Sequence, residues 1–346
     1  MVHEKTAGQG KKPQPRLALV ALALGACLLA AGAAVGVVAL YRSTEPVAPV
    51  GQAGEWDERC VQGPSVIWNP DAQLYQMWYD GRGATTNPGI GYATSPDGMV
   101  WTKYDGNPVI PPDARWPSVV FEPGDADAPY KIWFNVGPGD YIAYARSLDG
   151  INWTDIQTVL KLGPAGFYDD MNVAAPCVAK VNDEYWMYYD AGTSTVALPY
   201  KWGHYIAVAT SKDGVHWTKR QIVLRLGASG SWECGRVYNV QTIYRDGLFE
   251  MWYTGAAGTG QAEDSRNIGY ARSHDGLNWT KSPRNPVVWG AQAPKPYDAS
   301  VGPPAVLKTE EGYKIWFTAI PEKGEGPWQI GYAEYPPDAW DWTEGQ

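Results

Sequence analysis

Four short stretches of the sequence place an aromatic residue directly before an acidic one. They read EWDER, GFYDD, GSWEC and KPYDA, and contain the pairs Trp56-Asp57, Tyr168-Asp169, Trp232-Glu233 and Tyr297-Asp298. Cleavage of a glycosidic bond needs one carboxyl group to protonate the leaving oxygen and a second to act as base or nucleophile. Flat aromatic rings offer a contact surface to the C–H faces of sugars. The stretches therefore favour carbohydrate chemistry, provided that the fold brings them together.

We expect the acids of these stretches to be the catalytic groups. This catalytic set is Glu233, Asp57, Asp169 and Asp170, in which the longer Glu suits a proton donor. The expected substrate-binding set is Trp56, Asp113, Trp116, Tyr168, Asn172, Trp232, Arg236, Asn239, Tyr297 and Asp298; here PPDARWPS supplies Asp113 and Trp116 in a shifted register. Acids at strand-opening turns also cap backbone N–H groups, so a structural role stays open for each acid.

A turn sequence that recurs along the chain reveals the elements that must position these residues. It reads SPDGMVWT from Ser95, SLDGINWT from Ser147, SKDGVHWT from Ser211 and SHDGLNWT from Ser273, with a frayed copy YPPDAWDWT from Tyr335. Each copy follows apolar stretches such as YQMWYDG and IGYATS, which are rich in strand-forming residues. Asp-Gly between such stretches is typical of a hairpin, so we assign the repeated Asp and Trp residues to the scaffold.

The repeat predicts the fold class. Each unit of about sixty residues contains four short strands, and five such units predict a five-bladed β-propeller. No helical periodicity of useful length follows residue 45. The segment EPVAPVG (Glu45–Gly51) is similar to segments that follow the turn in other units, so we expect the N-terminal strand to complete the last blade. The prediction is an all-β five-bladed β-propeller over residues 42–346, preceded by a single transmembrane helix.

Weaker candidates lie near the channel that the innermost strands of such a ring enclose. Asp80 and Asp190 end equivalent predicted strands there, with a turn role as the alternative. Arg59 and Arg236 follow acids at matching offsets and would bind a carboxylate or phosphate, unless they pair with neighbouring acids. No spacing indicates a transition-metal site, and we predict no cofactor. A calcium ion would suit so many acids, but no pattern specifies one.

The pattern MWYDG, IGYATSPDGMVWTK and NPV resembles the five-bladed β-propeller glycosidase superfamily. That group includes glycoside hydrolase families 43, 62, 32, 68, 117 and 130, and the resemblance extends over residues 45–346. It implies two Asp and one Glu on the inner strands of successive blades, often with an Asp directly before a Pro. In this chain the residues before those prolines are Gly63, Trp116, Ala175 and Pro303. The resemblance carries over to the acids of the four stretches as residues that line the mouth of the channel.

The N-terminal segment is a separate part of the chain. Residues 1–16 are polar and basic, whereas residues 17–41 carry no charge. A helix over 17–41 would rise about 1.5 Å per residue and cross a hydrocarbon core of roughly 30 Å. Basic residues before this signal anchor predict a cytoplasmic N-terminal tail and an extracytoplasmic propeller. The stretch LGAC also resembles a lipobox with Cys27 as the lipidated residue, but the apolar run continues beyond it and favours the uncleaved anchor.

Composition excludes several classes of protein. The chain has 346 residues, of which 45% are hydrophobic and 13% aromatic, so it can bury a large core. The net charge is −9 and no long Lys/Arg run follows the predicted anchor, which argues against nucleic-acid binding. Three cysteines remain outside the anchor, and this odd number excludes a disulfide scaffold.

We therefore expect a membrane-anchored, extracytoplasmic glycosidase whose partner is a carbohydrate substrate or glycan. Hydrolysis, transfer and phosphorolysis of a glycosyl bond all fit the pattern. The first alternative is a non-catalytic propeller that binds envelope glycan or a protein partner, and the missing Asp-Pro pairs favour it. The second alternative is a structural part of a larger membrane assembly.

Overall fold

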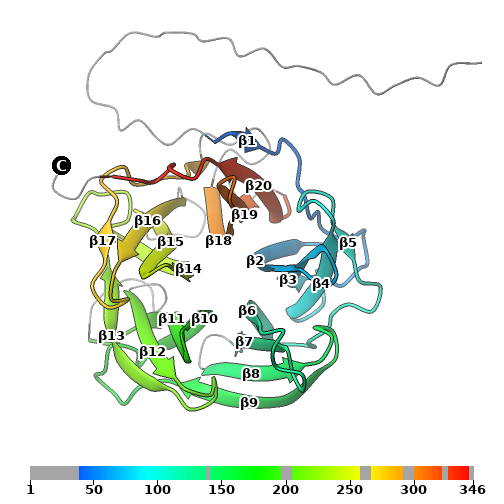
Figure 1. Cartoon of the computed structure of the whole chain (residues 1–346), viewed down its shortest axis with the longest axis horizontal. Helices are drawn as coiled ribbons and strands as arrows, with labels where there is room; N and C mark the ends of the chain where they lie inside the picture. The colour runs from blue at the N-terminus through cyan, green and yellow to red at the C-terminus, as the bar shows by residue number, and fades with distance from the viewer. Residues whose placement is uncertain are drawn as a thin grey trace, which may run out of the picture. The chain divides into compact units, whose positions relative to one another are not determined.

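The described part of the chain is a ring of five β-sheets. The computed structural model describes residues 39–137, 141–195, 205–257, 266–290, 300–321 and 326–342. These residues form five antiparallel sheets of four strands each, arranged around a centre (Figure 1). No α-helix occurs among them, and none of them belongs to a helix that would cross a membrane. The predicted all-β five-bladed propeller is confirmed.

Each blade begins with its innermost strand and proceeds outward. Blade 1 contains β2 (Cys60–Asn69), β3 (Leu74–Arg82), β4 (Gly89–Ser95) and β5 (Thr102–Lys103). Blade 2 contains β6 (Ala114–Phe121), β7 (Tyr130–Val136), β8 (Tyr141–Ser147) and β9 (Trp153–Lys161). Blade 3 contains β10 (Asn172–Val181), β11 (Glu184–Gly192), β12 (Tyr205–Ser211) and β13 (Thr218–Arg225). Blade 4 contains β14 (Arg236–Arg245), β15 (Leu248–Ala256), β16 (Asn267–Ser273) and β17 (Thr280–Lys281), and blade 5 contains β18 (Ser300–Lys308), β19 (Tyr313–Ile320), β20 (Gln329–Tyr335) and β1 (Tyr41–Arg42).

The two ends of the described chain meet in blade 5. Strand β1 pairs antiparallel with β20, with Tyr41 opposite Glu334. A further bridge joins Ala48 to Ile330, and equivalent bridges follow the outer turn in blades 1 and 4. The predicted closure of the ring by the N-terminal strand is confirmed. Of the predicted span 17–41, the last three residues belong to the described region, where Tyr41 is part of β1, and residues 17–38 lie outside it.

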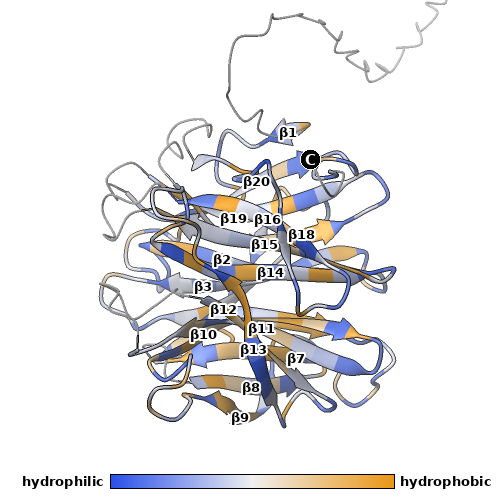
Figure 2. Cartoon of the chain, turned by 90° about the vertical axis from the view of Figure 1, so that its left-hand side faces the viewer, coloured by the Kyte–Doolittle hydropathy of each residue, from blue (hydrophilic) through white to orange (hydrophobic). Residues whose placement is uncertain are grey.

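The hydrophobic core is divided among the five interfaces between blades. Each core cluster combines side chains of two neighbouring blades; for example, Trp78 of β3 packs with Tyr130 and Ile132 of β7. The strands carry these apolar residues, and Figure 2 colours the hydrophobic positions along the strands orange. Because every blade needs both neighbours to bury its faces, the ring fixes the positions of the inner strands relative to one another.

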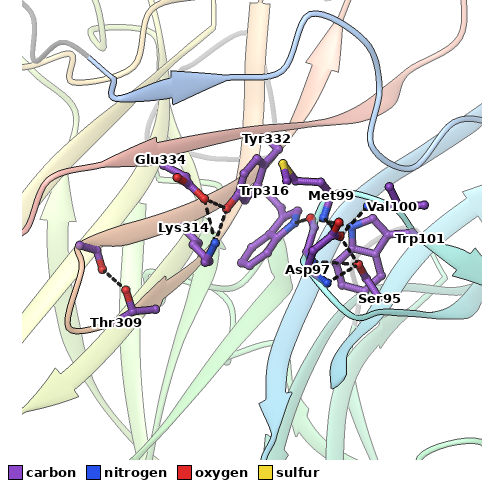
Figure 3. Close-up of polar contacts among 12 residues, drawn as sticks. Ser95, Asp97, Met99, Val100, Trp101, Thr309, Lys314, Trp316, Tyr332 and Glu334 are labelled. Carbon is purple, nitrogen blue, oxygen red and sulfur yellow. Dashed lines mark hydrogen bonds and ion pairs between the residues drawn. The ribbon is translucent and has the colours of Figure 1, made fainter. Parts of the chain in front are cut away.

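The Asp-Gly turns of blades 1 to 4 each attach their blade to the preceding one. The Asp97 carboxylate accepts the N–H groups of Met99 at 2.8 Å and Val100 at 2.9 Å. Gly98 has a φ of 82°, in the region that favours glycine. Its carbonyl accepts the indole N–H of Trp316 in blade 5 at 2.7 Å (Figure 3). The scaffold role predicted for this turn is confirmed.

The same contact recurs around the ring. Equivalent side chains donate to the turn glycine of the next blade, namely Trp78 to Gly150 at 2.8 Å, Trp133 to Gly214 at 2.8 Å and Tyr188 to Gly276 at 3.0 Å. In blade 4 the equivalent Trp252 indole has no hydrogen-bond partner within the described ranges. The frayed fifth turn, YPPDAWDWT, has no Asp-Gly to receive it. The interface of blades 4 and 5 is therefore held without this hydrogen bond.

Candidate active site at the central channel

The five inner strands enclose a narrow channel. Each inner strand has a break in its register, and the residues Gly63, Trp116, Ala175 and Asn239 there have φ between 45° and 55°. These residues and the prolines beside them line a cavity of about 30 Å³, which is room for water and too small for a sugar. The residues directly before these prolines are Gly63, Trp116, Ala175 and Pro303, so no carboxylate stands where the pattern of the glycosidase superfamily often has an Asp before a Pro.

A ring of buried polar residues lies directly beside the channel wall. Each blade supplies one residue from its second strand, and these five residues, the polar ring, are Asp80, Asn135, Asp190, Thr254 and Thr318. Two of them bind wall residues of the next blade. The N–H of Asn239 donates to Asp190 at 2.7 Å, and the N–H of Gly63 donates to Thr318 at 3.0 Å.

Asp80 is the ring residue of blade 1 and is only 1% exposed. Gln62, opposite it on β2, donates a hydrogen bond from Nε2 to the Asp80 carboxyl at 3.1 Å. Burial raises the pKa of Asp80 to about 7, although the charges of Arg115 and Arg82 act in the opposite direction. A carboxyl group that gains and loses its proton near neutral pH is suited to acid–base catalysis.

Asp190 is the ring residue of blade 3, and three predicted substrate-binding residues gather around it. Asn239 donates its backbone N–H to the carboxyl, and the Asn172 side chain donates to the Asp190 carbonyl at 3.3 Å. Burial raises the pKa of Asp190 well above its usual range, while the charge of Arg236 lowers it. The Arg236 guanidinium stacks over the Tyr238 ring at 4.4 Å. Burial thus favours the protonated form of Asp190.

The acids that directly follow the aromatic residue in these stretches, Asp57, Asp169 and Glu233, take a different position, between the second and the outermost strand of their own blades. Each of the three is buried, forms an ion pair with a lysine of the outermost strand and contacts a tyrosine of the second strand. The ion pairs are Asp57 with Lys103 at 2.7 Å, Asp169 with Lys219 at 2.5 Å and Glu233 with Lys281 at 2.7 Å. The hydroxyl groups of Tyr79 and Tyr189 donate to Asp57 and Asp169 at 3.1 and 2.9 Å. This contact is copied in three blades, and it is an ion pair with a lysine, which differs from the capping of backbone N–H groups that was the alternative role of these acids.

Asp170, the fourth predicted catalytic acid, connects two loops of blade 3. Its carboxylate accepts hydrogen bonds from the side chain and N–H of Ser194 and from the N–H of Gly166, and these lower its pKa to about 2. In blade 1, Glu58 makes the same connection by accepting the N–H groups of Gly54 and Ala84. The structure thus places Asp170 in a loop contact that blade 1 repeats.

The predicted aromatic residues are half-buried against their own blades. Trp56 stacks on Tyr79 and Trp232 on Tyr253, each with ring centroids 5.9 Å apart. Tyr168 is half-buried and packs against Phe167, with centroids 4.4 Å apart. Trp116 lines the channel, as described above. Asp113 is exposed and its backbone binds Pro88 and Gly137, whereas Tyr297 and Asp298 lie outside the described residues.

Sequence reasoning missed Gln62, Arg115 and Asn135 and gave too little weight to Asp80 and Asp190. The signal was available in the repeat, because one polar residue directly follows the aromatic run of each second strand: MWYD, IWFN, MYYD, MWYT and IWFT. Aligning these runs would have placed the ring residues at one level of the channel. Within the described part of the chain, no group of three or more His, Cys, Asp or Glu side chains is arranged to hold a metal ion.

Comparison with known proteins agrees with this fold. Two curated relatives, uncharacterized proteins from two strains of Mycobacterium tuberculosis, are each 26% identical over 203 residues, which cover 54% of this chain and 64% of the relative. The match thus spans less than two thirds of the length of these relatives.

Solved structures give a broader match. An N-acetylgalactosamine deacetylase from F. plautii, in complex with blood group B trisaccharide, has a TM-score of 0.64 at 17% identity, over 89% of this chain and 97% of that one. The catalytic domain of a GH62 α-L-arabinofuranosidase from Coprinopsis cinerea has a TM-score of 0.62 at 10% identity, over 84% of this chain and 95% of that one. At such identities the likeness shows the fold alone.

The family comparison is more specific. The profile described as "Glycosyl hydrolases family 32 N-terminal domain" matches residues 162–343, which is more than half of the chain. The matched region includes blades 3 and 4 and the strands β18, β19 and β20 of blade 5. The chain therefore belongs to the glycosyl hydrolases family 32 N-terminal domain family.

Proposed function

We propose that this protein hydrolyses a glycosidic bond at the end of the channel where the polar ring lies. One observation carries the proposal: two buried carboxyl groups, Asp80 and Asp190, occupy equivalent positions beside the channel of a fold shared with glycosidases. Their surroundings differ, which is how one site keeps an acid and a base at the same pH. The acids of the aromatic–acid stretches support the scaffold in this proposal.

The two carboxyl groups have separate tasks. Burial favours the protonated form of Asp190, so it is the group that protonates the leaving oxygen. The backbone N–H of Asn239 and the Arg236 charge stabilise the carboxylate that forms when the proton leaves. Asp80 ionises near neutral pH because Arg115 and Arg82 offset part of its burial, so it is the base or nucleophile.

The test is turnover by the full-length chain, purified in detergent, on a panel of aryl furanosides and pyranosides. Asp80→Asn and Asp190→Asn should each lower kcat/KM by about 10²- to 10⁴-fold, the contribution usual for general acid–base groups. Asp246→Asn is a matched control, because Asp246 is exposed at the far end of the β14–β15 hairpin. Turnover that survives in both ring variants would contradict the assignment.

A second function is favoured by one observation. The channel-wall positions that precede proline carry Gly63, Trp116 and Ala175, so the usual family carboxylates are absent there. A propeller that binds a glycan without cleaving it would have this arrangement. Saturable glycan binding without turnover of any aryl glycoside would support this second function over hydrolysis.

We also propose that a single N-terminal helix tethers the propeller outside the cytoplasm. Residues 17–38 carry no charge and would extend about 33 Å as a helix, close to the roughly 30 Å of a hydrocarbon core. Protease added to intact cells should digest the propeller and spare the N-terminal tail. Cys27→Ser should leave the protein in the membrane fraction; its release would instead indicate the lipoprotein alternative.

A further inference from the structure

Two arginines of neighbouring blades lie beside Asp80. Arg82 follows Asp80 by two positions on β3, so both side chains leave the strand on the same face. Strand β3 packs against β6, where Arg115 is opposite Asn135 and adjacent to Trp116 of the channel wall. Both guanidinium groups act on the Asp80 carboxyl, whose pKa they lower against the effect of burial. The arginines and Asp80 thus share one environment at the interface of blades 1 and 2.

Among the described residues of this environment, cations outnumber the carboxyl groups on which they act. Throughout the described residues, neither the Arg82 nor the Arg115 guanidinium forms a hydrogen bond or a close ion pair, and both side chains are half-buried. Asp80 is the described carboxyl group on which both arginines act. The neighbouring Cys60 thiol is neutral, because burial raises its pKa. In the part of the chain that the structure describes, two cations therefore face one carboxyl group.

Two other described acids of blade 1 are already bound. Asp57 pairs with Lys103, and the Glu58 carboxylate accepts backbone N–H groups of two loops. Asp190, in blade 3, interacts with Asn239 and Arg236 of blade 4. These three described acids therefore do not pair with the two arginines.

Buried amide groups around the same end of the channel also lack partners. The side-chain oxygens of Gln62, Asn135 and Asn172 have no hydrogen-bond partner in the part of the chain that the structure describes. These residues are only 6%, 2% and 1% exposed. Buried polar atoms are nearly always hydrogen-bonded, so these three acceptors are sites at which a donor from outside the described residues would be stabilised. Hydroxyl groups donate to such oxygens, which suits a sugar.

We infer that Arg82 and Arg115 bind an oxyanion carried by the sugar, so that the substrate class is an anionic glycan. The inference rests on the proposed function, because it assigns a substrate to the same site. Guanidinium groups bind carboxylates and phosphates through paired, charge-assisted hydrogen bonds. The open amide oxygens of the ring would bind the hydroxyl groups of the same sugar. The carboxylate of an acidic sugar and the phosphate of a sugar ester share this chemistry.

The test measures binding by calorimetry on the full-length chain, with matched pairs of neutral and anionic sugars. The pairs are the methyl glycosides of glucose, galactose and mannose with their uronic acids, together with glucose 6-phosphate and inorganic phosphate. We expect at least one anionic sugar to bind ten-fold or more tightly than its neutral partner, and the uronic acid and phosphate arms identify which oxyanion is preferred. Equal binding of neutral and anionic members, no binding of any anionic sugar, or inorganic phosphate binding as tightly as any sugar would each overturn the inference.

Variants connect the preference to the two arginines. The double variant Arg82→Gln/Arg115→Gln should lose the ten-fold preference, whereas Arg245→Gln, an exposed arginine at the far end of β14, should keep it. Arg115→Lys retains the positive charge but loses the planar guanidinium group, so it should keep part of the preference. This milder variant gives a second test if the double variant does not fold. A double variant that folds and retains the full preference would overturn the assignment.

Failure of this inference is distinguishable from failure of the proposed function. If anionic sugars bind through the arginines but are never cleaved, the proposed hydrolase activity is contradicted and the anion-binding site is supported. If neutral aryl glycosides are cleaved and no anionic sugar binds, hydrolysis is supported and the anion-binding site is contradicted. Raising the salt concentration should weaken the binding of the anionic sugars selectively, because their attraction to the arginines is screened.

Discussion

Replacing Asp80 with Asn should stabilise the protein at the pH where Asp80 is ionised. Asp80 is fully enclosed, and its pKa rises from 3.8 to about 7 because burial opposes the charged form. The folded protein thus binds a proton that the unfolded chain has already released above about pH 4. Folding must therefore become less favourable as the pH rises from about 4 to about 7, and the effect levels off above pH 7.

The size of the effect follows from the shift. A rise from 3.8 to about 7 is about three pKa units, each worth 1.36 kcal/mol, which amounts to about 4 kcal/mol above pH 7. At pH 5 only the first part of the interval has been crossed, and the penalty is about 1.6 kcal/mol. Asn has the shape of a protonated Asp and bears no charge. The advantage of Asp80→Asn over the native chain should therefore grow by about 2 to 3 kcal/mol between pH 5 and pH 8.

The assay is urea unfolding of both proteins at pH 5 and pH 8, followed by tryptophan fluorescence. Other buried groups such as Asp190 contribute the same pH dependence to both proteins, so they cancel in the difference. The reciprocal variant Asn135→Asp places a carboxyl group at the equivalent ring position of blade 2 and should lose stability as the pH rises. Parallel pH dependences for the native chain and Asp80→Asn would refute the reasoning.

Three further outcomes follow from contacts described above. Lys219→Met leaves the buried Asp169 carboxylate without its cation and should lower the free energy of unfolding by about 3 kcal/mol, the low end for a buried pair because the lysine is 20% exposed. Adding Asp169→Asn should recover part of this loss in urea unfolding. A double variant no more stable than Lys219→Met alone would contradict the pairing. Gly150→Ala should cost about 2 to 4 kcal/mol, because φ is 77° and a new Cβ would lie 2.8 Å from an indole carbon of blade 1. The control Gly166→Ala has φ of 85° but open space, so a loss equal to that of Gly150→Ala would exclude the steric term. With a cleaved substrate in hand, kcat/KM should rise with pH through about 7 as Asp80 ionises, and a flat profile there would exclude Asp80 as the base.

The architecture was predictable because the sequence repeats its strands and turns. The Asp-Gly turn marks blades 1 to 4, and its carboxylate caps backbone N–H groups as its residue types imply. Ring closure was predictable from the similarity of Glu45–Gly51 to segments that follow other turns. The repeat did not predict the hydrogen bond that links neighbouring blades, because the Trp316 indole and the Gly98 carbonyl are 218 positions apart in the sequence.

The candidate site was harder to predict because one residue type serves two purposes in a repeat. The aromatic–acid stretches combine acids with rings, but the acids of blades 1, 3 and 4 pair with the lysine that follows Trp-Thr in the same units. Blade 2 lacks the aromatic–acid pair, and Asp155 replaces that lysine in the sequence NWTD. This covariation within one chain is a sequence signal for an ion pair. Burial, which separates Asp80 and Asp190 from exposed acids, is not visible in residue types alone.

The joining of the first and last strands in one blade sets an order on biosynthesis. Ser43 and Tyr332 bond each other across 289 positions of the chain. At translation rates of about 5 to 20 residues per second, the first strand would wait roughly 15 to 60 s for its partner to leave the ribosome. During that interval the open ring exposes the apolar flank of blade 1 that blade 5 later covers. A nascent chain of this kind would need a chaperone, or rapid delivery across the membrane, until its final hairpin has been made.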